Sequence, residues 1–388
     1  MPISDEWSFP EGTIYLNHGS FGPSPRCVRE ARNAWTEKLE RQPMDFFLRQ
    51  MESELDHAAE KLGQLIGAEG NDLLFCDNAT VAMNIVADSF PLQPGDEVLF
   101  TNQEYGAVMR IWRRACDRSQ AKIVVQPLPR PIISAEQQVA ALMAGVTERT
   151  KLIVVSHITS QTAVIFPIEA ICREAAKRGV KVCVDGPHAL AMVEMNLRRL
   201  GCDFYCASCH KWLSAPFGSG FLYVAKRYQQ LLSPPVMSWG GSVAGRPAHW
   251  QDEFRWLGTR DPAPFLAVPS AIEFLDRFGC ETFREQTHEL AKYARQRISE
   301  LTGLEPAMPD SREWYGSMIA LPLPPTEAPN QGIRDQLQTP LWEKFGIEVP
   351  IIHWHGERLI RVSCHLYSTR EHIDRLIEAL RDFGIGRS

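Results

Sequence analysis

The sequence predicts an α/β protein with a mostly parallel central sheet covered by helices, followed by a smaller α+β unit. Short apolar runs rich in β-branched residues alternate with amphipathic helical stretches through the middle of the chain. Strands buried on both faces of a parallel sheet read as nearly continuous apolar runs, so this alternation favours a covered parallel sheet. With 388 residues, the chain is long enough that two domains are expected.

The expected elements of the larger unit alternate between strand and helix. Ligands of such sheets bind beyond the carboxyl ends of the strands, so residues that directly follow a strand are the candidates for chemistry. In chain order we expect strand 72–76, helix 79–89, strand 97–100, helix 106–116, strand 122–126, strand 151–156, helix 167–178, strand 180–185 and strand 203–208.

The character of the sequence changes after the Thr-Arg-Asp-Pro stretch that ends at residue 262. Charged helical segments are then followed by short apolar runs, which is typical of a small α+β domain. The expected elements there are helices 267–278 and 281–301, strands near 317–321 and 359–363, a surface loop at 322–329 and a closing helix at 372–383. The predicted organisation is a large domain of residues 41–265, a small domain of residues 266–388 and an amino-terminal segment, residues 1–40, that packs with the small domain.

The composition excludes several functional classes. A net charge of −6 offers no basic surface for nucleic acid or an anionic membrane. No segment reaches the ~20 apolar residues that span a bilayer. The amino terminus is acidic and lacks an apolar run, so we read no signal peptide and expect a cytoplasmic protein. The ten cysteines are therefore expected to be free thiols.

One cluster has spacing that resembles a metal site: Cys202, Cys206, Cys209 and His210. The same stretch reads as a buried strand, in which small thiols serve as packing residues. Alternation along that strand directs Cys206 and Cys209 to opposite faces. We therefore expect no metal.

Two residues that follow strands carry the first chemical signal. Asp185 ends an apolar strand, which places a carboxylate at the mouth of the sheet, although capping or turn residues have the same pattern. Lys211 follows the next strand and is flanked by apolar residues. Desolvation there favours its neutral amine, the form that attacks an aldehyde. Pyridoxal phosphate (PLP) requires this pair, because a lysine binds its aldehyde and a carboxylate keeps its ring nitrogen protonated.

Longer segments make a resemblance specific. The chain resembles fold-type I PLP enzymes of the class V aminotransferase group, which contains the cysteine desulfurases, and within it the isopenicillin N epimerase-like branch. The resemblance implies an aspartate aminotransferase-like fold and PLP as cofactor. The segments are YLNHGSFGPSP (15–25), DNATVAMN (77–84), SHITSQTAVIFPI (156–168), VDGPHA (184–189), SCHKWLSAPFGSGFLYV (208–224) and LIRVSCHLYST (359–369).

The resemblance implies a role for each matching residue. Lys211 holds the cofactor as a Schiff base and moves the α-proton, Asp185 pairs with the ring nitrogen, His188 approaches the ring hydroxyl, and Tyr105 covers the ring face. Ser160 stands where the commoner relatives have an Asn that contacts the ring oxygen. The expected phosphate contacts are Ala79 and Thr80 at a helix start, Ser208, His210, and Thr259 from a neighbouring subunit. The last contact implies a homodimer with shared active sites.

Substrate contacts are expected from both ends of the chain. Arg361 is a single charge on an apolar strand, where a cation is costly unless it meets an anion. A guanidinium grips a carboxylate through two parallel hydrogen bonds, so we expect Arg361 to bind the α-carboxylate of an amino acid. Asn17, His18 and Gly19 are expected to help hold the substrate.

The reaction stays open among several outcomes at the α-carbon. The first expectation is epimerisation or racemisation, with Tyr105, His353 or His355 as a possible second base. The alternatives are C–S cleavage by β-elimination, as in the ergothioneine sulfoxide lyases that share the LNHGSFG motif, and transamination. Desulfuration is disfavoured because residues 350–356 contain no cysteine nucleophile. A catalytically inactive dimeric scaffold is the non-enzyme alternative, against which Lys211 and Asp185 argue.

Overall fold

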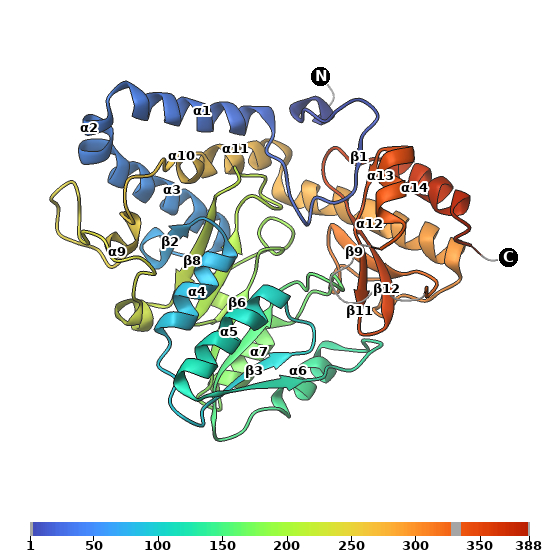
Figure 1. Cartoon of the computed structure of the whole chain (residues 1–388), viewed down its shortest axis with the longest axis horizontal. Helices are drawn as coiled ribbons and strands as arrows, with labels where there is room; N and C mark the ends of the chain where they lie inside the picture. The colour runs from blue at the N-terminus through green and yellow to red at the C-terminus, as the bar shows by residue number, and fades with distance from the viewer. Residues whose placement is uncertain (1–2, 327–334, 387–388) are drawn as a thin grey trace.

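A seven-stranded sheet forms the centre of the protein. The structure is a computed structural model that describes residues 3–326 and 335–386 (Figure 1). The sheet order is β2-β8-β7-β6-β5-β3-β4, and its strands are β2 (Leu73–Cys76), β3 (Glu97–Thr101), β4 (Lys122–Gln126), β5 (Thr150–Ser156), β6 (Lys181–Asp185), β7 (Phe204–Ser208) and β8 (Gly220–Val224). Strands β3 to β7 pair in parallel, whereas β8 is antiparallel to both neighbours. The prediction of a mostly parallel sheet in an α/β fold is confirmed.

The two faces of the sheet belong to two different apolar clusters. In β5, Leu152 and Val154 pack into one cluster, and Ile153 and Val155 pack into the other. Alternation along a strand therefore buries every residue of this run, which is why it lacks the polar positions of a half-exposed strand. Helices α4 (Ala79–Ser89) and α5 (Gly106–Ser119) cover the first face.

Helices α6 (Ala135–Met143) and α7 (Ile168–Ala176) pack into the cluster of the second face. The long helix α3 (Met51–Ile66) runs beside α11 (Val268–Phe278) and leads into β2. Its carboxyl end contributes Leu62 and Ile66 to the same cluster. Short helices complete this part of the chain: α2 (Pro43–Asp45), α8 (Leu197–Leu200), α9 (Asp252–Arg255) and α10 (Ala263–Leu266).

A three-stranded antiparallel sheet forms the carboxyl-terminal part of the protein. Its order is β11-β12-β9, with β9 (Met318–Pro322), β11 (Ile351–Trp354) and β12 (Glu357–Ser363). Helices α12 (Cys280–Thr302) and α14 (Arg370–Asp382) pack against each other, and α12 also packs against β9. Helix α13 (Gln338–Phe345) precedes β10 (Ile347–Glu348).

The amino-terminal segment connects both parts. Strand β1 (Ile14–Tyr15) pairs in parallel with β10, and the backbone of Asn17 bridges to Ser363 at the end of β12. Helix α1 (Arg26–Arg41) then packs on α10 and α11 (Figure 1). The segment before α1 therefore lies beside the carboxyl-terminal sheet, and the predicted division into domains stays a prediction.

Among the elements that the sequence analysis did not anticipate are α1, α3, α6, α13, β8 and β11. Strand β8 lies in the segment 208–224, which entered the sequence analysis as a motif. It follows β7 without an intervening helix and runs antiparallel to it. The expected loop at 322–329 falls partly outside the described residues. None of the helices in residues 3–326 and 335–386 has the length and apolar character needed to cross a membrane. In the same residues, no group of three or more His, Cys, Asp or Glu side chains is arranged to hold a metal ion.

Candidate active site

A cavity of about 370 Å³ lies at the carboxyl ends of the central strands. It brings together most of the predicted site residues, which come from segments between positions 19 and 361. The predicted residues that line it are Gly19, Ala79, Thr80, Tyr105, Ser160, Asp185, His188, Ser208, His210, Lys211 and Arg361. Further lining residues are Ser20, Phe21, Asn78, Val108, Ile158 and Pro187.

Lys211 is half-buried beside His188, and Lys211 Nζ lies 3.2 Å from His188 Nε2. The indole N–H of Trp212 donates to His188 Nδ1 at 3.2 Å, so the imidazole carries its proton on Nε2. A neutral imidazole N–H of this kind can donate to the lone pair of a neutral amine. Burial, reinforced by the positive charge of Arg361, lowers the pKa of Lys211 from 10.5 to about 7. Geometry and electrostatics thus both favour a nucleophilic amine near neutral pH.

Asp185 is buried at the end of β6, and burial raises its pKa to about 7, an effect that the nearby Lys211 partly offsets. A second buried carboxyl group, that of Glu104, lies just after the end of β3, the strand that pairs with β5. It accepts hydrogen bonds from Thr101 Oγ1 at 2.6 Å and from the N–H and hydroxyl of Ser156 at 2.8 and 2.6 Å. Burial also raises the pKa of Glu104 to about 7. Its contacts fix the loop that carries Tyr105, a function that strand-end reasoning did not identify.

The amino terminus of α4 faces the cavity. The Asn78 side chain caps the helix by accepting from Val81 N–H at 3.0 Å, and Ser208 Oγ accepts from Ala79 N–H at 3.0 Å. The chain approaches closely at Gly220, where a Cβ would lie 2.6 Å from the Ala207 carbonyl oxygen. Since the N–H groups of Ala79 and Val81 donate within the chain, the Thr80 N–H and the positive end of the helix dipole are what this end of the cavity offers to a phosphate.

Arg361 lies on β12 with only 4% of its surface exposed. Its guanidinium donates to the Ser160 carbonyl oxygen at 2.6 Å and to Ser20 Oγ at 2.7 Å, which are both uncharged. Burial lowers the pKa of Arg361 to about 10. Arg358 on the same strand is equally buried but forms a two-bond ion pair with Asp335, at 2.7 Å for both bonds. Arg361 is therefore a buried cation that contacts no carboxylate among the described residues. A bound carboxylate would compensate its charge.

The amino-terminal loop passes between the Lys211 turn and the carboxyl-terminal sheet. A Cβ on Gly19 would lie 2.7 Å from Met318 Sδ and 3.0 Å from Ser363 Oγ. The close approach explains why a residue without a side chain stands there, directly before Ser20. Ser20 was missed by sequence reasoning, because a serine in a loop gives no sign of the arginine that it meets 341 positions later.

Three predicted residues do not line the cavity. Asn17 donates to Glu348 Oε1 at 3.4 Å, and His18 lies fully buried behind Lys211. Thr259 is exposed in the segment before α10. Tyr105 does line the cavity and is 46% exposed. The roles of all these residues stay predictions.

The cysteine-free residues 350–356 include strand β11 and the turn of the β11–β12 hairpin. Its turn consists of His355 and Gly356, both with positive φ angles, and its strands pair from Ile351–Ile360 to Trp354–Glu357. His353 bonds Asp335 at 2.7 Å, and neither it nor His355 lines the cavity. Cys364 is fully buried, and burial raises its pKa to about 12. No cysteine lies among the described residues that line the cavity.

The side chains present fit PLP. Two buried nitrogens that belong to residues lining the cavity, His210 Nδ1 and Arg361 Nε, have no hydrogen-bond partner among the described residues. A phosphate-binding helix end, a carboxyl group and a lysine amine surround the same space, as the cofactor requires. Lys211 would bind its aldehyde, Asp185 its ring nitrogen, and the α4 amino terminus with Ser208 and His210 its phosphate.

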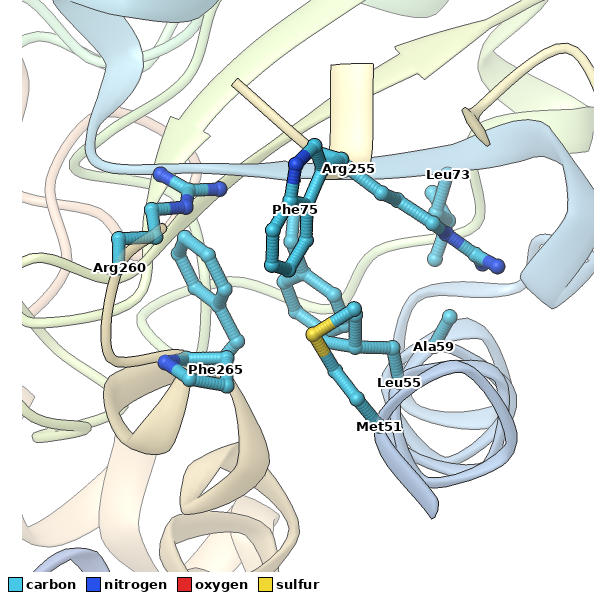
Figure 2. Close-up of a pocket in the computed structure, with 10 residues that line it drawn as sticks. Met51, Leu55, Ala59, Leu73, Phe75, Arg255, Arg260 and Phe265 are labelled. Atoms are coloured by element: carbon cyan, nitrogen blue, oxygen red, sulfur yellow. The ribbon is translucent and has the colours of Figure 1, made fainter. Parts of the chain in front are cut away.

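A second cavity lacks comparable chemistry. It has a volume of about 20 Å³, enough for roughly one water, and lies between α3, β2 and α10 (Figure 2). Its lining is apolar apart from Arg255 and Arg260. Arg255 pairs with Asp56, and Arg260 pairs with Asp77 at 2.9 Å. Their charges are already compensated, so this cavity is a packing void.

Three comparisons relate the chain to known proteins. Residues 25–376 match the family described as aminotransferase class-V. The chain is 38% identical to an isopenicillin N epimerase of Amycolatopsis lactamdurans, over 97% of each chain. It is 30% identical to a probable chloroplastic L-cysteine desulfhydrase of Arabidopsis thaliana, over 94% of this chain and 82% of that protein. A structure of a C-DES mutant with glycine covalently linked to the PLP cofactor has a TM-score of 0.81 at 20% identity, covering 96% and 97% of the two chains.

The lowered pKa of Lys211 generates a prediction for the cofactor-free protein. Its amine should react with an acylating reagent with a midpoint near pH 7, since the pKa falls from 10.5 to about 7 and only the neutral amine reacts. Labelling should be slow below this pH, where the amine is protonated, and should level off above it. Mass spectrometry of the Lys211 peptide across pH measures the profile, with the exposed Lys122 as a reference for reagent decay. Labelling that still rises steeply above pH 9 would contradict the prediction.

The two arginines of β12 form a matched pair for a stability test. Replacing Arg358 by Met removes the arginine partner of the buried Asp335 and leaves it with His353, which is expected to cost about 3 kcal/mol. Arg361→Met removes a buried cation without stranding a carboxylate, so its cost should be smaller by about 2 kcal/mol or more. Urea unfolding of the cofactor-free variants measures both. Equal losses would show that Arg361 is satisfied within the chain.

Proposed function

Because the chain belongs to the class-V aminotransferase family, we propose that it is an epimerase or racemase that inverts the α-carbon of an amino-acid substrate. The prediction that PLP is its cofactor is confirmed. Support for the reaction comes from the similarity to an isopenicillin N epimerase, which extends over nearly the whole of both chains. The observation that carries the proposal is Arg361, a buried cation without a carboxylate, in one cavity with the Lys211 amine.

Arg361 orients the substrate in this proposal. The α-carboxylate enters against the guanidinium and receives charge-assisted hydrogen bonds, while Ser20 and the Ser160 carbonyl oxygen hold the guanidinium plane. This grip places the α-carbon within reach of Lys211. PLP supplies an electron-accepting ring that stabilises negative charge on the α-carbon.

Lys211 and a second group then exchange one proton at the α-carbon. Lys211 removes or returns the proton on one face, and its lowered pKa matches this task near neutral pH. Inversion requires a proton on the opposite face. Of the three candidates for the second base, Tyr105 lines the cavity, whereas His353 and His355 do not, so we assign this role to Tyr105. Asp185 and His188 hold the cofactor ring in this scheme.

A C–S lyase is the second candidate, and the similarity to a probable L-cysteine desulfhydrase favours it over transamination. Such a reaction begins with the same proton removal by Lys211, but a leaving group then departs from the β-carbon. The absence of a cysteine among the described cavity residues fits elimination as well as epimerisation, and it argues against desulfuration through a cysteine nucleophile.

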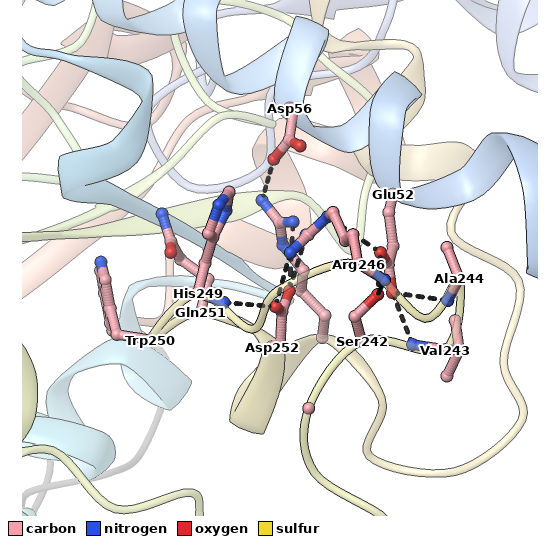
Figure 3. A network of polar contacts seen from close by, with 12 residues as sticks. Glu52, Asp56, Ser242, Val243, Ala244, Arg246, His249, Trp250, Gln251 and Asp252 are labelled. Carbon is pink, nitrogen blue, oxygen red and sulfur yellow. Dashed lines mark hydrogen bonds and ion pairs between the residues drawn. The ribbon is translucent and has the colours of Figure 1, made fainter.

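We also propose that the protein is a cytoplasmic homodimer in which Thr259 contacts the partner's cofactor phosphate. The segment before Thr259 presents Met237 and Trp239, which are 81% and 89% exposed. It is nevertheless held in place: Glu52 accepts from Ser242 Oγ and Val243 N–H, both at 2.7 Å (Figure 3). Arg246 in turn bonds both Glu52 and Asp252 (Figure 3). An ordered segment with exposed apolar side chains supports an interface with a second copy.

The reaction is tested by incubating the holoenzyme in heavy water with an amino-acid panel that includes isopenicillin N and L-cysteine. An epimerase yields inverted product with deuterium at the α-carbon, read by chiral chromatography and mass spectrometry. Lys211→Ala should slow this exchange by at least about 100-fold. Pyruvate, ammonia and sulfide without inversion would instead establish the lyase. A holoprotein inert to the whole panel would support the inactive scaffold.

Shared sites are tested by mixing two inactive variants. Lys211→Ala and Thr259→Arg each damage one half of the site, the latter by placing bulk near the phosphate. If Thr259 acts across the interface, the mixed dimer contains one intact site, and up to about one quarter of wild-type activity returns on mixing. Size-exclusion chromatography with light scattering checks the dimer. No recovery in a mixture shown to contain mixed dimers would contradict the proposal.

A further inference from the structure

The space directly behind Lys211 is filled by the imidazole of His18, which is fully buried. His18 Nε2 lies 2.9 Å from the carbonyl oxygen of Lys211, and His18 Nδ1 lies 2.7 Å from the hydroxyl of Tyr367. One residue of the amino-terminal loop thus contacts both the lysine turn and the carboxyl-terminal part of the chain.

These contacts define the protonation of His18. A carbonyl oxygen only accepts, so Nε2 must carry the proton that it donates to Lys211. Nδ1 is then the acceptor, and the Tyr367 hydroxyl is its donor. Burial lowers the pKa of His18 to about 3, which agrees with a neutral ring. The Tyr367 hydroxyl therefore selects the tautomer that can hold the lysine carbonyl.

The carbonyl of Lys211 is held from two sides. It accepts from His18 and also from Ser214 N–H at 2.9 Å. Ser214 has a φ of +56°, a conformation that residues with side chains rarely adopt. A Cβ on Gly22 would lie 2.5 Å from His18 Nε2 and 2.6 Å from the Lys211 oxygen, so only glycine fits beside this bond. The turn that directs the Lys211 side chain is thus enclosed by its neighbours.

The same imidazole stacks on His365, with ring centroids 3.9 Å apart and planes at 12°. His365 and Tyr367 follow β12 directly, four and six positions after Arg361. The main chain joins Arg361 to His365 and Tyr367, and both of these residues contact His18, which in turn bonds the Lys211 carbonyl. This path connects the group that faces the substrate carboxylate with the amine that faces the cofactor.

We propose that His18 is a positioning residue that fixes the main chain of Lys211 relative to the segment that follows Arg361. This role differs from the expectation that His18 helps to hold the substrate. It rests on Lys211 being the lysine that binds the cofactor, but not on which reaction follows. Tyr367 acts through His18 by holding its tautomer.

Three variants test the proposal. His18→Asn removes the donor to the Lys211 carbonyl, His18→Gln retains an N–H near the Nε2 position, and Tyr367→Phe frees the tautomer. In the first and third, covalent attachment of added PLP to Lys211, followed by absorbance, should slow by about tenfold, and kcat should fall with KM changed less than threefold. His18→Gln should restore most of the attachment rate. Tyr367→Phe should add less than twofold in the His18→Gln background, because its effect runs through His18.

His288→Gln is the matched control, because His288 is another buried histidine that bonds a backbone carbonyl outside the cavity. Its Nδ1 lies 3.1 Å from the Tyr315 oxygen, and the amide of glutamine, which stands near the Nε2 position, does not keep a donor there. This control variant should leave the attachment rate unchanged. The proposal is overturned if His18→Asn attaches PLP as fast as wild type. It is equally overturned if His18→Gln fails to rescue and His288→Gln causes the same loss, since the effect would then be general destabilisation. Borohydride reduction followed by peptide mapping tests separately whether Lys211 binds the cofactor, so the two failures are distinguishable.

Discussion

The burial of two cations in one cavity is the constraint on which the site depends. Burial lowers the pKa of both Lys211 and Arg361, and the charge of Arg361 lowers the pKa of Lys211 further. Lys211 responds by becoming neutral, whereas a guanidinium cannot readily do so. The cavity therefore holds one neutral nucleophile and one charge that needs an anion. Both properties follow from desolvation, before any detail of the reaction is considered.

The central sheet produces this arrangement through its strand ends. Asp185, Ser156 and Ser208 end neighbouring strands, so their side chains gather at one edge, and the amino terminus of α4 reaches the same edge. The carboxyl-terminal sheet then adds Arg361 from the opposite side. The glycine-containing loop near residue 19 fills the gap between these two bodies. An alteration in that loop would change the distance between the amine and the guanidinium rather than the chemistry of either.

The sequence was most informative where a local pattern carries the whole signal. Lys211 and Asp185 follow apolar strands, and Arg361 is a lone charge in an apolar run, so each stands out without a structure. Glu104 and Ser20 do not, because their importance comes from partners that are distant in the sequence. The sequence analysis expected His18 to help hold the substrate, but a sequence does not show that its imidazole bonds the main-chain carbonyl of Lys211. The alternation of strand and helix did not indicate β8, because no helix lies between β7 and β8.

The tight turn of the β11–β12 hairpin limits how this scaffold could acquire new chemistry. Only His355 and Gly356 lie between the paired strands, and both have left-handed backbone angles. A cysteine substituted at this tip would have no length of chain with which to swing toward the cavity. Divergence toward sulfur transfer would thus need inserted residues rather than point changes, so hairpin length offers a marker for separating homologues whose cavities are otherwise alike.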